Sequence, residues 1–138
     1  MWDVDKAVAH LNSHASKESQ GRCAAYVRQA IEAGGVTLVR QASAKNYGDS
    51  LEKVAFREVR ESEWDIVAGD VVVIQPIAGH PHGHMAMYNG SLWVSDFVQQ
   101  RGYYPGPSYR KQKPPVAFYR HVVMLARSSI ERLRLAHA

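Results

Sequence analysis

Apolar residues recur at intervals of three and four in two segments near the start of the chain, which predicts two amphipathic helices. The first helix is expected over residues 4–15 and the second over residues 21–33. Their apolar faces consist of Val4, Ala7, Val8 and Leu11 in the first helix and Cys23, Val27, Ala30 and Ile31 in the second. Ser19 is the expected N-cap of the second helix, which ends at the pair Gly34 and Gly35.

After residue 55 the pattern changes to short apolar runs that are rich in β-branched residues, which predicts strands. The run Val71-Val72-Val73-Ile74 is typical of a buried central strand, and residues 83–88 form the next strand. Asn89 and Gly90 predict a hairpin turn, after which residues 92–98 return beside that strand. The remaining predicted elements are strands at 36–39, 56–59 and 117–121, a short helix at 50–54, a loop at 99–115 and helical character at 128–137.

This order, with helices first and a meandering antiparallel sheet second, predicts an α+β fold. A chain of 138 residues is long enough for one domain with its own core and too short for two ordinary ones. We therefore expect a single domain over residues 1–138, within which residues 122–138 form a C-terminal helix or tail.

Composition and charge narrow the class of protein without fixing its function. Hydrophobic residues make up 46% of the chain and charged residues 22%, as in an ordinary globular protein. The sequence contains no run of eighteen consecutive apolar residues, so a membrane span is not predicted. The net charge of +4 favours an anionic partner such as a cell-wall polymer, although a generic surface explains it equally well. No long basic run or aromatic ladder indicates binding to nucleic acid.

The N-terminal residues Met1-Trp2-Asp3-Val4 lack the basic and then apolar order of a signal peptide. We therefore expect synthesis in the cytoplasm without a signal peptide. Action in the periplasm or on the cell wall would then require non-classical export.

The single cysteine, Cys23, excludes an internal disulfide and is the first candidate for chemistry. Only the thiolate is a strong nucleophile, and the free N–H groups at a helix N-terminus lower the pKa of a thiol placed there. Cys23 lies two residues inside the predicted start of the second helix, next to Arg22. A buried structural cysteine explains the same position equally well, so the local sequence leaves both interpretations open.

A cysteine nucleophile needs a nearby imidazole and a polar group that orients the imidazole. His84 begins a predicted central strand, and a turn at 89–90 places it opposite Ser95 or Asp96 on the returning strand. A carboxylate at Asp96 would fix the tautomer of His84. The sequence thus predicts that Cys23, His84 and Asp96 meet.

The histidines allow a different interpretation, a zinc site. His80, His82 and His84 alternate along the chain and could bind zinc together with Cys23. Pro81 and Gly83 argue for a turn instead, so catalysis is the preferred interpretation and no metal is expected. His10 and His14, spaced by four residues, are more often a solvated helix face than a metal pair.

Aromatic residues are the candidates for a substrate groove, although such residues more often belong to a core. The candidates are Trp64, Trp93, Tyr103, Tyr104 and Tyr109. Asp70, at the entrance of a strand, is expected to act in a turn or cap rather than in catalysis.

Four segments in this order resemble the CHAP and NlpC-type cysteine amidases and peptidases, papain-like enzymes that cut amide bonds in bacterial peptidoglycan. The segments are Ser19-x-Gly21-x-Cys23-Ala24-x-Tyr26-Val27-Arg28, Gly69-Asp70-Val71-Val72, Gly83-His84-Met85-Ala86-Met87-Tyr88 and Trp93-Val94-Ser95-Asp96-Phe97. The size of the chain and the missing signal peptide also resemble the amidase toxins of type VI secretion or phage-type lysins. The resemblance implies a papain-like fold with N-terminal helices packed on a central antiparallel sheet.

The resemblance also implies roles for individual residues and requires no metal or cofactor. Cys23 becomes the nucleophile, His84 the general base and Asp96 the orienting residue of a Cys-His-Asp triad. The backbone N–H of Cys23 is the natural oxyanion donor, with the side chain of Gln20 or Ser19 as a second. The residues expected to contact the substrate are Gln20, Gly21, His82 and Ser95.

The expected function is hydrolysis, through a thioester, of an amide in the peptide stems or crosslinks of peptidoglycan by a single catalytic domain. Two alternatives remain: a papain-like protease or acyltransferase that acts on protein, and a non-catalytic module that binds cell wall or nucleic acid. If the protein is a toxin, the resemblance implies an immunity protein that plugs the groove between Cys23 and His84.

Overall fold

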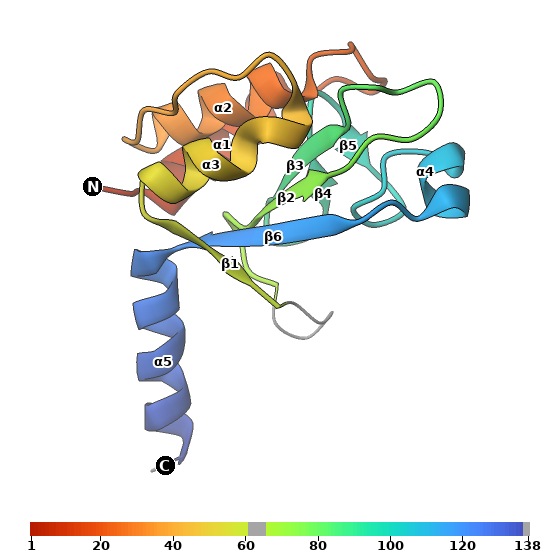
Figure 1. The fold of residues 1–138 in the computed structure, drawn as a ribbon. Helices are drawn as coiled ribbons and strands as arrows, with labels where there is room; N and C mark the ends of the chain where they lie inside the picture. The colour runs from red at the N-terminus through yellow and green to blue at the C-terminus, as the bar shows by residue number, and fades with distance from the viewer. Residues whose placement is uncertain (61–65, 137–138) are drawn as a thin grey trace.

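The computed structural model describes residues 1–60 and 66–136 and shows helices packed on one face of an antiparallel sheet (Figure 1). The helices are α1 (Val4–His14), α2 (Cys23–Ala33), the 3₁₀ turn η1 (Ala44–Asn46), α3 (Tyr47–Lys53), α4 (Pro107–Gln112) and α5 (Val122–Ala136). The strands are β1 (Phe56–Val59), β2 (Val71–Ile74), β3 (His84–Tyr88), β4 (Trp93–Val94), β5 (Val98–Gln99) and β6 (Val116–His121).

The sheet has the strand order β1-β6-β2-β3-β4-β5, and every neighbouring pair is antiparallel. The four residues of β2 are buried on both faces, which explains why this strand is apolar throughout rather than alternating. On one side β2 pairs with β6, and on the other it pairs with β3, where Ile74 lies opposite His84. The sheet therefore holds His84 at the first position of β3 through its pairing with β2.

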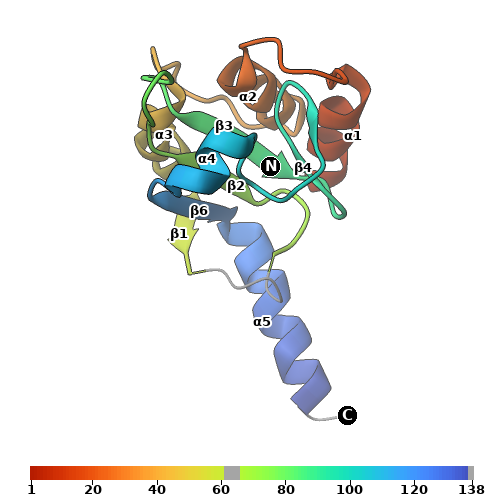
Figure 2. The same cartoon turned by 90° about the vertical axis from the view of Figure 1, so that its right-hand side faces the viewer.

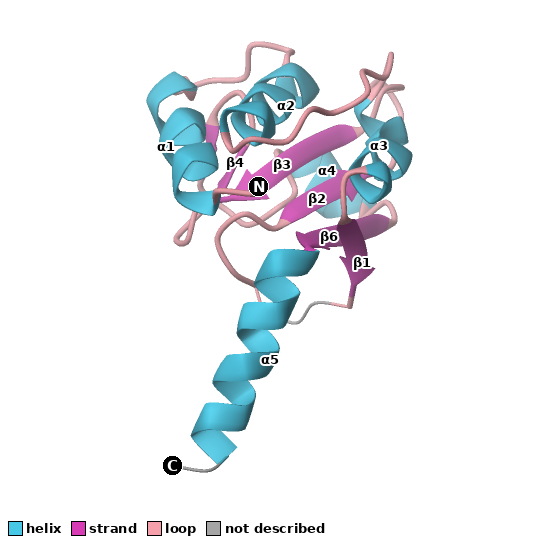
Figure 3. Ribbon diagram, turned by 90° about the vertical axis from the view of Figure 1, so that its left-hand side faces the viewer, coloured by secondary structure: helices cyan, strands magenta, loops and turns pink. Residues whose placement is uncertain are grey.

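Helices α1, α2 and α3 cover one face of the sheet (Figure 3). Their apolar residues, among them Leu11, Val27, Ile31 and Leu51, form one core with Val73, Met85 and Met87 of the sheet. Each of these side chains is almost fully removed from water, which stabilises the fold by roughly 1.5–3 kcal/mol for each large side chain. Packing of α2 on β3 brings the start of this helix towards the start of that strand.

The other face of the sheet carries a second apolar cluster that includes Val72, Ile74, Ala86, Trp93 and Tyr109. The loop after β5 and helix α4 cover part of this face (Figure 2). Helix α5 points away from the body of the molecule and exposes Ile130, Leu133 and Leu135. Among the described residues, no helix is both long enough and apolar enough to cross a bilayer.

The structure confirms most of the predicted elements and corrects four of them. Residues 36–39 form no strand, and the predicted loop at 99–115 contains helix α4, whose first residue is Pro107. The short helix predicted at 50–54 begins earlier, at Tyr47. The predicted strand at 92–98 is two short strands, because the chain turns between Val94 and Val98. Trp64 lies outside the described residues.

A buried ion pair joins the residue before β2 to strand β6. The carboxylate of Asp70 is fully buried and accepts hydrogen bonds from Nε and a terminal nitrogen of Arg120, each at 2.8 Å. It also accepts a hydrogen bond from the backbone N–H of Val67, so its role is the structural one expected from its position.

We expect Asp70→Asn to lower the free energy of unfolding by roughly 3–5 kcal/mol, because it removes the buried negative charge that faces the guanidinium of Arg120. Chemical denaturation measures this change. Glu131→Gln, which breaks the exposed pair with Arg134, is the matched control and should change stability little. Equal effects of the two substitutions would contradict the assigned role of the buried pair.

Candidate active site

The segment before α2 is held in place by the carboxylate of Asp96. Its Oδ2 accepts hydrogen bonds from the backbone N–H groups of Gln20 at 2.6 Å and Arg22 at 2.9 Å. The hydroxyl of Ser95 donates to the other oxygen, Oδ1, at 3.2 Å. The predicted N-cap, Ser19, instead accepts a hydrogen bond from the N–H of Gly21. A carboxylate from a distant part of the chain thus satisfies N–H groups that a local cap would otherwise serve.

Cys23 is the first residue of α2 and is partly buried. Burial raises the pKa of its thiol above the ordinary value, and the negative charge of Asp96 acts in the same direction. Hydrogen bonds from the backbone of Met85, Ala24 and Cys23 itself act in the opposite direction and favour the thiolate. The resting thiol is therefore protonated at neutral pH, in surroundings that already offer donors to a developing negative charge.

His84 is the first residue of β3, and its side chain is held by Gln99 of β5. Nε2 of His84 lies 2.7 Å from Oε1 of Gln99, and both side chains are buried. The amide nitrogen of Gln99 donates to the backbone carbonyls of Gly102 and Tyr103, so its oxygen is the atom that faces His84. Oε1 can only accept, so the proton of the neutral imidazole lies on Nε2. This leaves the lone pair on Nδ1.

Burial lowers the pKa of His84 to about 4, because the charged imidazolium loses its hydration. The hydrogen bond to Gln99 and the charge of Asp96 raise the pKa, and His80 lowers it further. At neutral pH the imidazole is therefore uncharged and able to accept a proton.

One pocket of about 510 Å³ contains both Cys23 and His84. Its walls include Gly21 on the helix side, His80 and His82 on the loop before β3, and Tyr109 of α4. The ring of Tyr109 lies 6.1 Å from that of His84, measured between centroids, and covers it from the side of α4. A nucleophile and a base thus open into the same cavity, which is the arrangement that acyl transfer requires.

The residues predicted to contact the substrate divide into two groups. Gly21 and His82 line the pocket, and Gly21 has open space around its Cα. Ser95 is fully buried and supports Asp96, so it does not reach the cavity. The side chain of Gln20 donates to the carbonyl of Glu18 and is exposed to solvent.

The pairing predicted for His84 is wrong in register. Residues 89–92 form the turn, Tyr88 pairs with Trp93, and β4 ends at Val94 before it reaches Ser95 or Asp96. The charge of Asp96 still acts on both Cys23 and His84, but its carboxylate accepts hydrogen bonds from the backbone before α2 and from Ser95. Sequence reasoning missed Gln99, which bonds the imidazole directly. The alternating pattern of residues 92–98 would have to continue past the turn at Ser95 and Asp96 for the sequence to place Gln99 beside His84.

The alternative zinc site finds little support in the geometry. Among residues 1–60 and 66–136, no three His, Cys, Asp or Glu side chains are arranged to hold a metal ion. Nε2 of His84 is bonded to Gln99, and Nδ1 of His82 lies 2.6 Å from the hydroxyl of Ser43. The rings of His10 and His14 stack on each other at 3.9 Å.

The fold and sequence match solved structures of one effector. The chain is 51% identical to Tae3 in the native type VI effector-immunity complex Tae3-Tai3 from Ralstonia pickettii, with a TM-score of 0.83 over 87% of this chain and 99% of that chain. The selenomethionine form of the complex gives the same identity and a TM-score of 0.80, over 85% of this chain and 100% of that chain. This chain belongs to the Tae3 family of type VI effectors.

Membership in the Tae3 family confirms the resemblance to type VI amidase effectors and the α+β fold with N-terminal helices on an antiparallel sheet. The structure of Ly7917 shares the fold at 16% identity, with a TM-score of 0.54 over 85% of this chain and 62% of that chain. No protein-family model matches the chain, and neither does any curated protein sequence.

We expect the imidazole of His84 to titrate near pH 4, because burial disfavours its charged form. NMR of the ring carbons as a function of pH measures this value directly, and a His84→Gln variant assigns the signals. A midpoint for His84 close to 6.5 would contradict the buried, uncharged base.

Proposed function

We propose that this Tae3-family effector is a cysteine amidase that cleaves an amide bond in the peptide stems or crosslinks of bacterial peptidoglycan. The observation that carries the proposal is the shared pocket of Cys23 and His84, with the thiol at the start of a helix and the imidazole fixed in one tautomer. The family supports the choice of substrate, since its members include effectors of type VI secretion. The site of action is then the cell wall of a target bacterium.

The reaction begins from a neutral pair. Nδ1 of His84 accepts the proton of the Cys23 thiol as the sulfur attacks the substrate carbonyl, so charge separates only when the substrate is present. The hydrogen bond from Nε2 of His84 to Gln99 keeps the ring in the orientation that this transfer needs, and it stabilises the imidazolium that forms.

The backbone before α2 limits which groups can stabilise the tetrahedral oxyanion. Asp96 already engages the N–H groups of Gln20 and Arg22, which removes both as donors. The N–H of Cys23, at the first position of α2, is a backbone donor that already faces the sulfur and is not engaged by Asp96. It binds the oxyanion while the positive end of the helix adds to the same stabilisation.

Collapse of the tetrahedral intermediate breaks the carbon–nitrogen bond. The leaving amine takes the proton from Nδ1 of His84, and the acyl group stays on the sulfur of Cys23 as a thioester. Water then attacks the thioester, His84 takes one proton from that water, and the carboxylic acid is released as the thiol re-forms. The proton that left with the amine is replaced by the one from water, so the thiol and the neutral imidazole are regenerated.

Two residues share the part of the third catalytic-site member, the one that supports the nucleophile and the base. Gln99 orients the imidazole through a direct hydrogen bond. Asp96, the predicted triad member, acts on the site through its charge and through the backbone that it holds before Cys23. Both are positioning residues in this proposal, and Gln99 takes the direct orienting role that the sequence assigned to Asp96.

A partner protein follows from the same family relation. Tae3 of Ralstonia pickettii was solved in complex with the immunity protein Tai3. We propose that a cognate immunity protein binds this chain and closes the pocket between Cys23 and His84.

Cys23→Ala should abolish the release of fragments from purified sacculi, because no other described side chain can form the thioester. Mass spectrometry of the soluble fragments measures the release. Thermal unfolding should change little, since the thiol is only partly buried. Fragment release by the variant at the wild-type rate would overturn the proposed nucleophile.

Gln99→Ala should lower kcat by roughly 10- to 100-fold with a small change in KM, because the imidazole loses its orientation. Asp96→Asn should also lower kcat, through loss of the charge that favours imidazolium and of one acceptor for the backbone before Cys23. Kinetics on a soluble stem-peptide substrate separate kcat from KM. Asn12→Ala, which removes an amide bonded to Asn89 away from the catalytic pocket, is the control. Full kcat in the Gln99 variant would exclude its role.

A further inference from the structure

A second cavity, of about 450 Å³, adjoins the catalytic pocket. Gly21, Cys23 and His82 line both cavities, so the nucleophile lies at their junction. A substrate that places its carbonyl over Cys23 can therefore extend into both cavities. We call the second cavity the cationic arm and define it by the residues that it does not share with the catalytic pocket, namely Arg22, Ala24, Ala25, Arg28, residues 40–44 and Tyr47.

The two cavities differ in their position relative to the base, because His84 lines the catalytic pocket and not the cationic arm. In the proposed reaction Nδ1 of His84 gives its proton to the leaving amine, so the amine lies on the side of the imidazole. The acyl group stays on the sulfur of Cys23 and extends away from the amine. The cationic arm is therefore the space open to the acyl part of the substrate.

Three arginines give the cationic arm its charge, and the described residues that line it include no Asp or Glu. Arg28 is neutralised by Glu32, to whose carboxylate it donates a hydrogen bond at 2.7 Å. The guanidinium of Arg22 lies 5.9 Å from the ring centroid of Tyr26, a contact that does not neutralise its charge. Arg40 is exposed, and its guanidinium has no hydrogen-bond or ion-pair partner among the described residues. Two cations are thus available to an anionic group of the substrate.

The backbone on both sides of Arg40 is fixed by Ser50, a fully buried residue of α3. The hydroxyl of Ser50 donates to the carbonyl of Val39 at 2.7 Å and accepts a hydrogen bond from the side-chain amide of Gln41 at 2.9 Å. The fold therefore sets the position of Arg40 before a substrate binds. A pre-set position reduces the entropy that is lost when the side chain engages an anion.

The chemistry of a guanidinium indicates which anion it binds in a peptide. Its paired N–H donors match the two oxygens of a carboxylate. The peptide stems of peptidoglycan contain dicarboxylic amino acids that join the next residue through one carboxyl group. The other carboxyl group stays free and is ionised at neutral pH. Stem amides that follow such a residue therefore carry a free carboxylate on their acyl side.

We infer that the cationic arm binds a free carboxylate on the acyl side of the scissile amide, with Arg40 as the residue that recognises it and Arg22 as a second cation. This inference rests on the proposed function and adds the chemical class of amide that is cleaved. Because the acyl part remains on Cys23 in the thioester, Arg40 binds the same carboxylate before and after the amine leaves.

The test combines a substitution in the protein with a substitution in the substrate. Stem peptides are prepared in the native form and with each free carboxylate replaced in turn by a carboxamide. Arg40→Gln should lower kcat/KM on the native peptide by about tenfold, because a charge-assisted hydrogen bond is lost. One carboxamide replacement should lower the kcat/KM of the wild type by a similar factor and make it insensitive to Arg40→Gln. Mass spectrometry should find that carboxylate on the acyl product.

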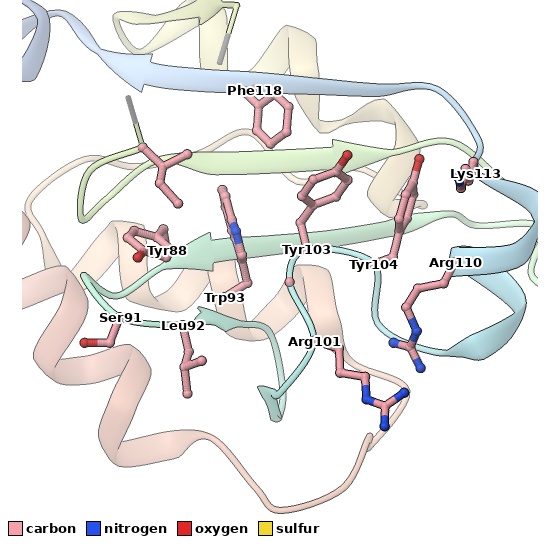
Figure 4. A pocket seen from close by; sticks show the side chains of 12 residues that line it. Tyr88, Ser91, Leu92, Trp93, Arg101, Tyr103, Tyr104, Arg110, Lys113 and Phe118 are labelled. Atoms are coloured by element: carbon pink, nitrogen blue, oxygen red, sulfur yellow. The ribbon is translucent and has the colours of Figure 1, made fainter. Parts of the chain in front are cut away.

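Arg101→Gln is the matched control, because it removes an exposed arginine from a different cavity. That cavity is lined by Trp93, Tyr103 and Phe118 among others and does not include Cys23 (Figure 4). The control should cleave every peptide with the kcat/KM of the wild type. Arg40→Lys, which keeps the positive charge, should lose less activity on the native peptide than Arg40→Gln.

A wild type that cleaves the native peptide and every carboxamide peptide equally well would overturn the inference. An equal loss on all peptides in Arg40→Gln would also overturn it, because a structural effect does not depend on the substrate carboxylate. The same holds if the decisive carboxylate is found on the amine product. Failure of the wild type to cleave any peptide or purified sacculi would instead reject the proposed function.

Discussion

The carboxylate of Asp96 accepts hydrogen bonds from the backbone N–H groups of Gln20 and Arg22, and the position of Cys23 depends on these bonds. No local side chain caps α2, so the turn that precedes the thiol is tied to the sheet rather than to its own sequence neighbours. The same carboxylate is buried and bonded to Ser95, which limits its movement. A single buried charge therefore fixes the start of the helix, leaves the N–H of Cys23 available and adds its field to the imidazole.

Gln99 plays the corresponding part on the strand side of the site. Its amide has three partners, namely His84 and the carbonyls of Gly102 and Tyr103. The tautomer of the base and the path of the loop over the second face are consequently set by one side chain. This arrangement couples the orientation of the imidazole to the backbone of the loop at Gly102 and Tyr103.

Much of the fold could be predicted from the sequence because its signals are local. The face formed by Val4, Ala7 and Leu11 fixes α1, and the β-branched run 71–74 fixes the central strand. Cys23 and His84 could be found for the same reason, since each begins an element with a clear apolar pattern. Pro107 at the first position of α4 was a usable signal within a segment otherwise rich in turn residues.

The features that could not be predicted depend on contacts between residues that are far apart in the sequence. The alternating pattern of residues 92–98 predicts one strand, but the backbone turns within it. The N–H of Ser95 donates to the carbonyl of Phe97, and the carboxylate of Asp96 accepts from the N–H groups of Gln20 and Arg22. That turn shifts Gln99, rather than Asp96, to the imidazole. Hydrophobic periodicity carries no information about a buried amide whose partners lie in a loop, so the direct partner of His84 could not be predicted.

The proposed reaction requires that Cys23 attacks the substrate carbonyl with His84 as its base. The most direct test is mass spectrometry of enzyme mixed with purified muropeptides, quenched in acid during turnover and mapped after digestion. We predict an acyl fragment of the stem peptide in thioester linkage to Cys23, and no such adduct in Cys23→Ala. Turnover that continues in the Cys23→Ala variant, or an acyl group attached to another residue, would contradict it.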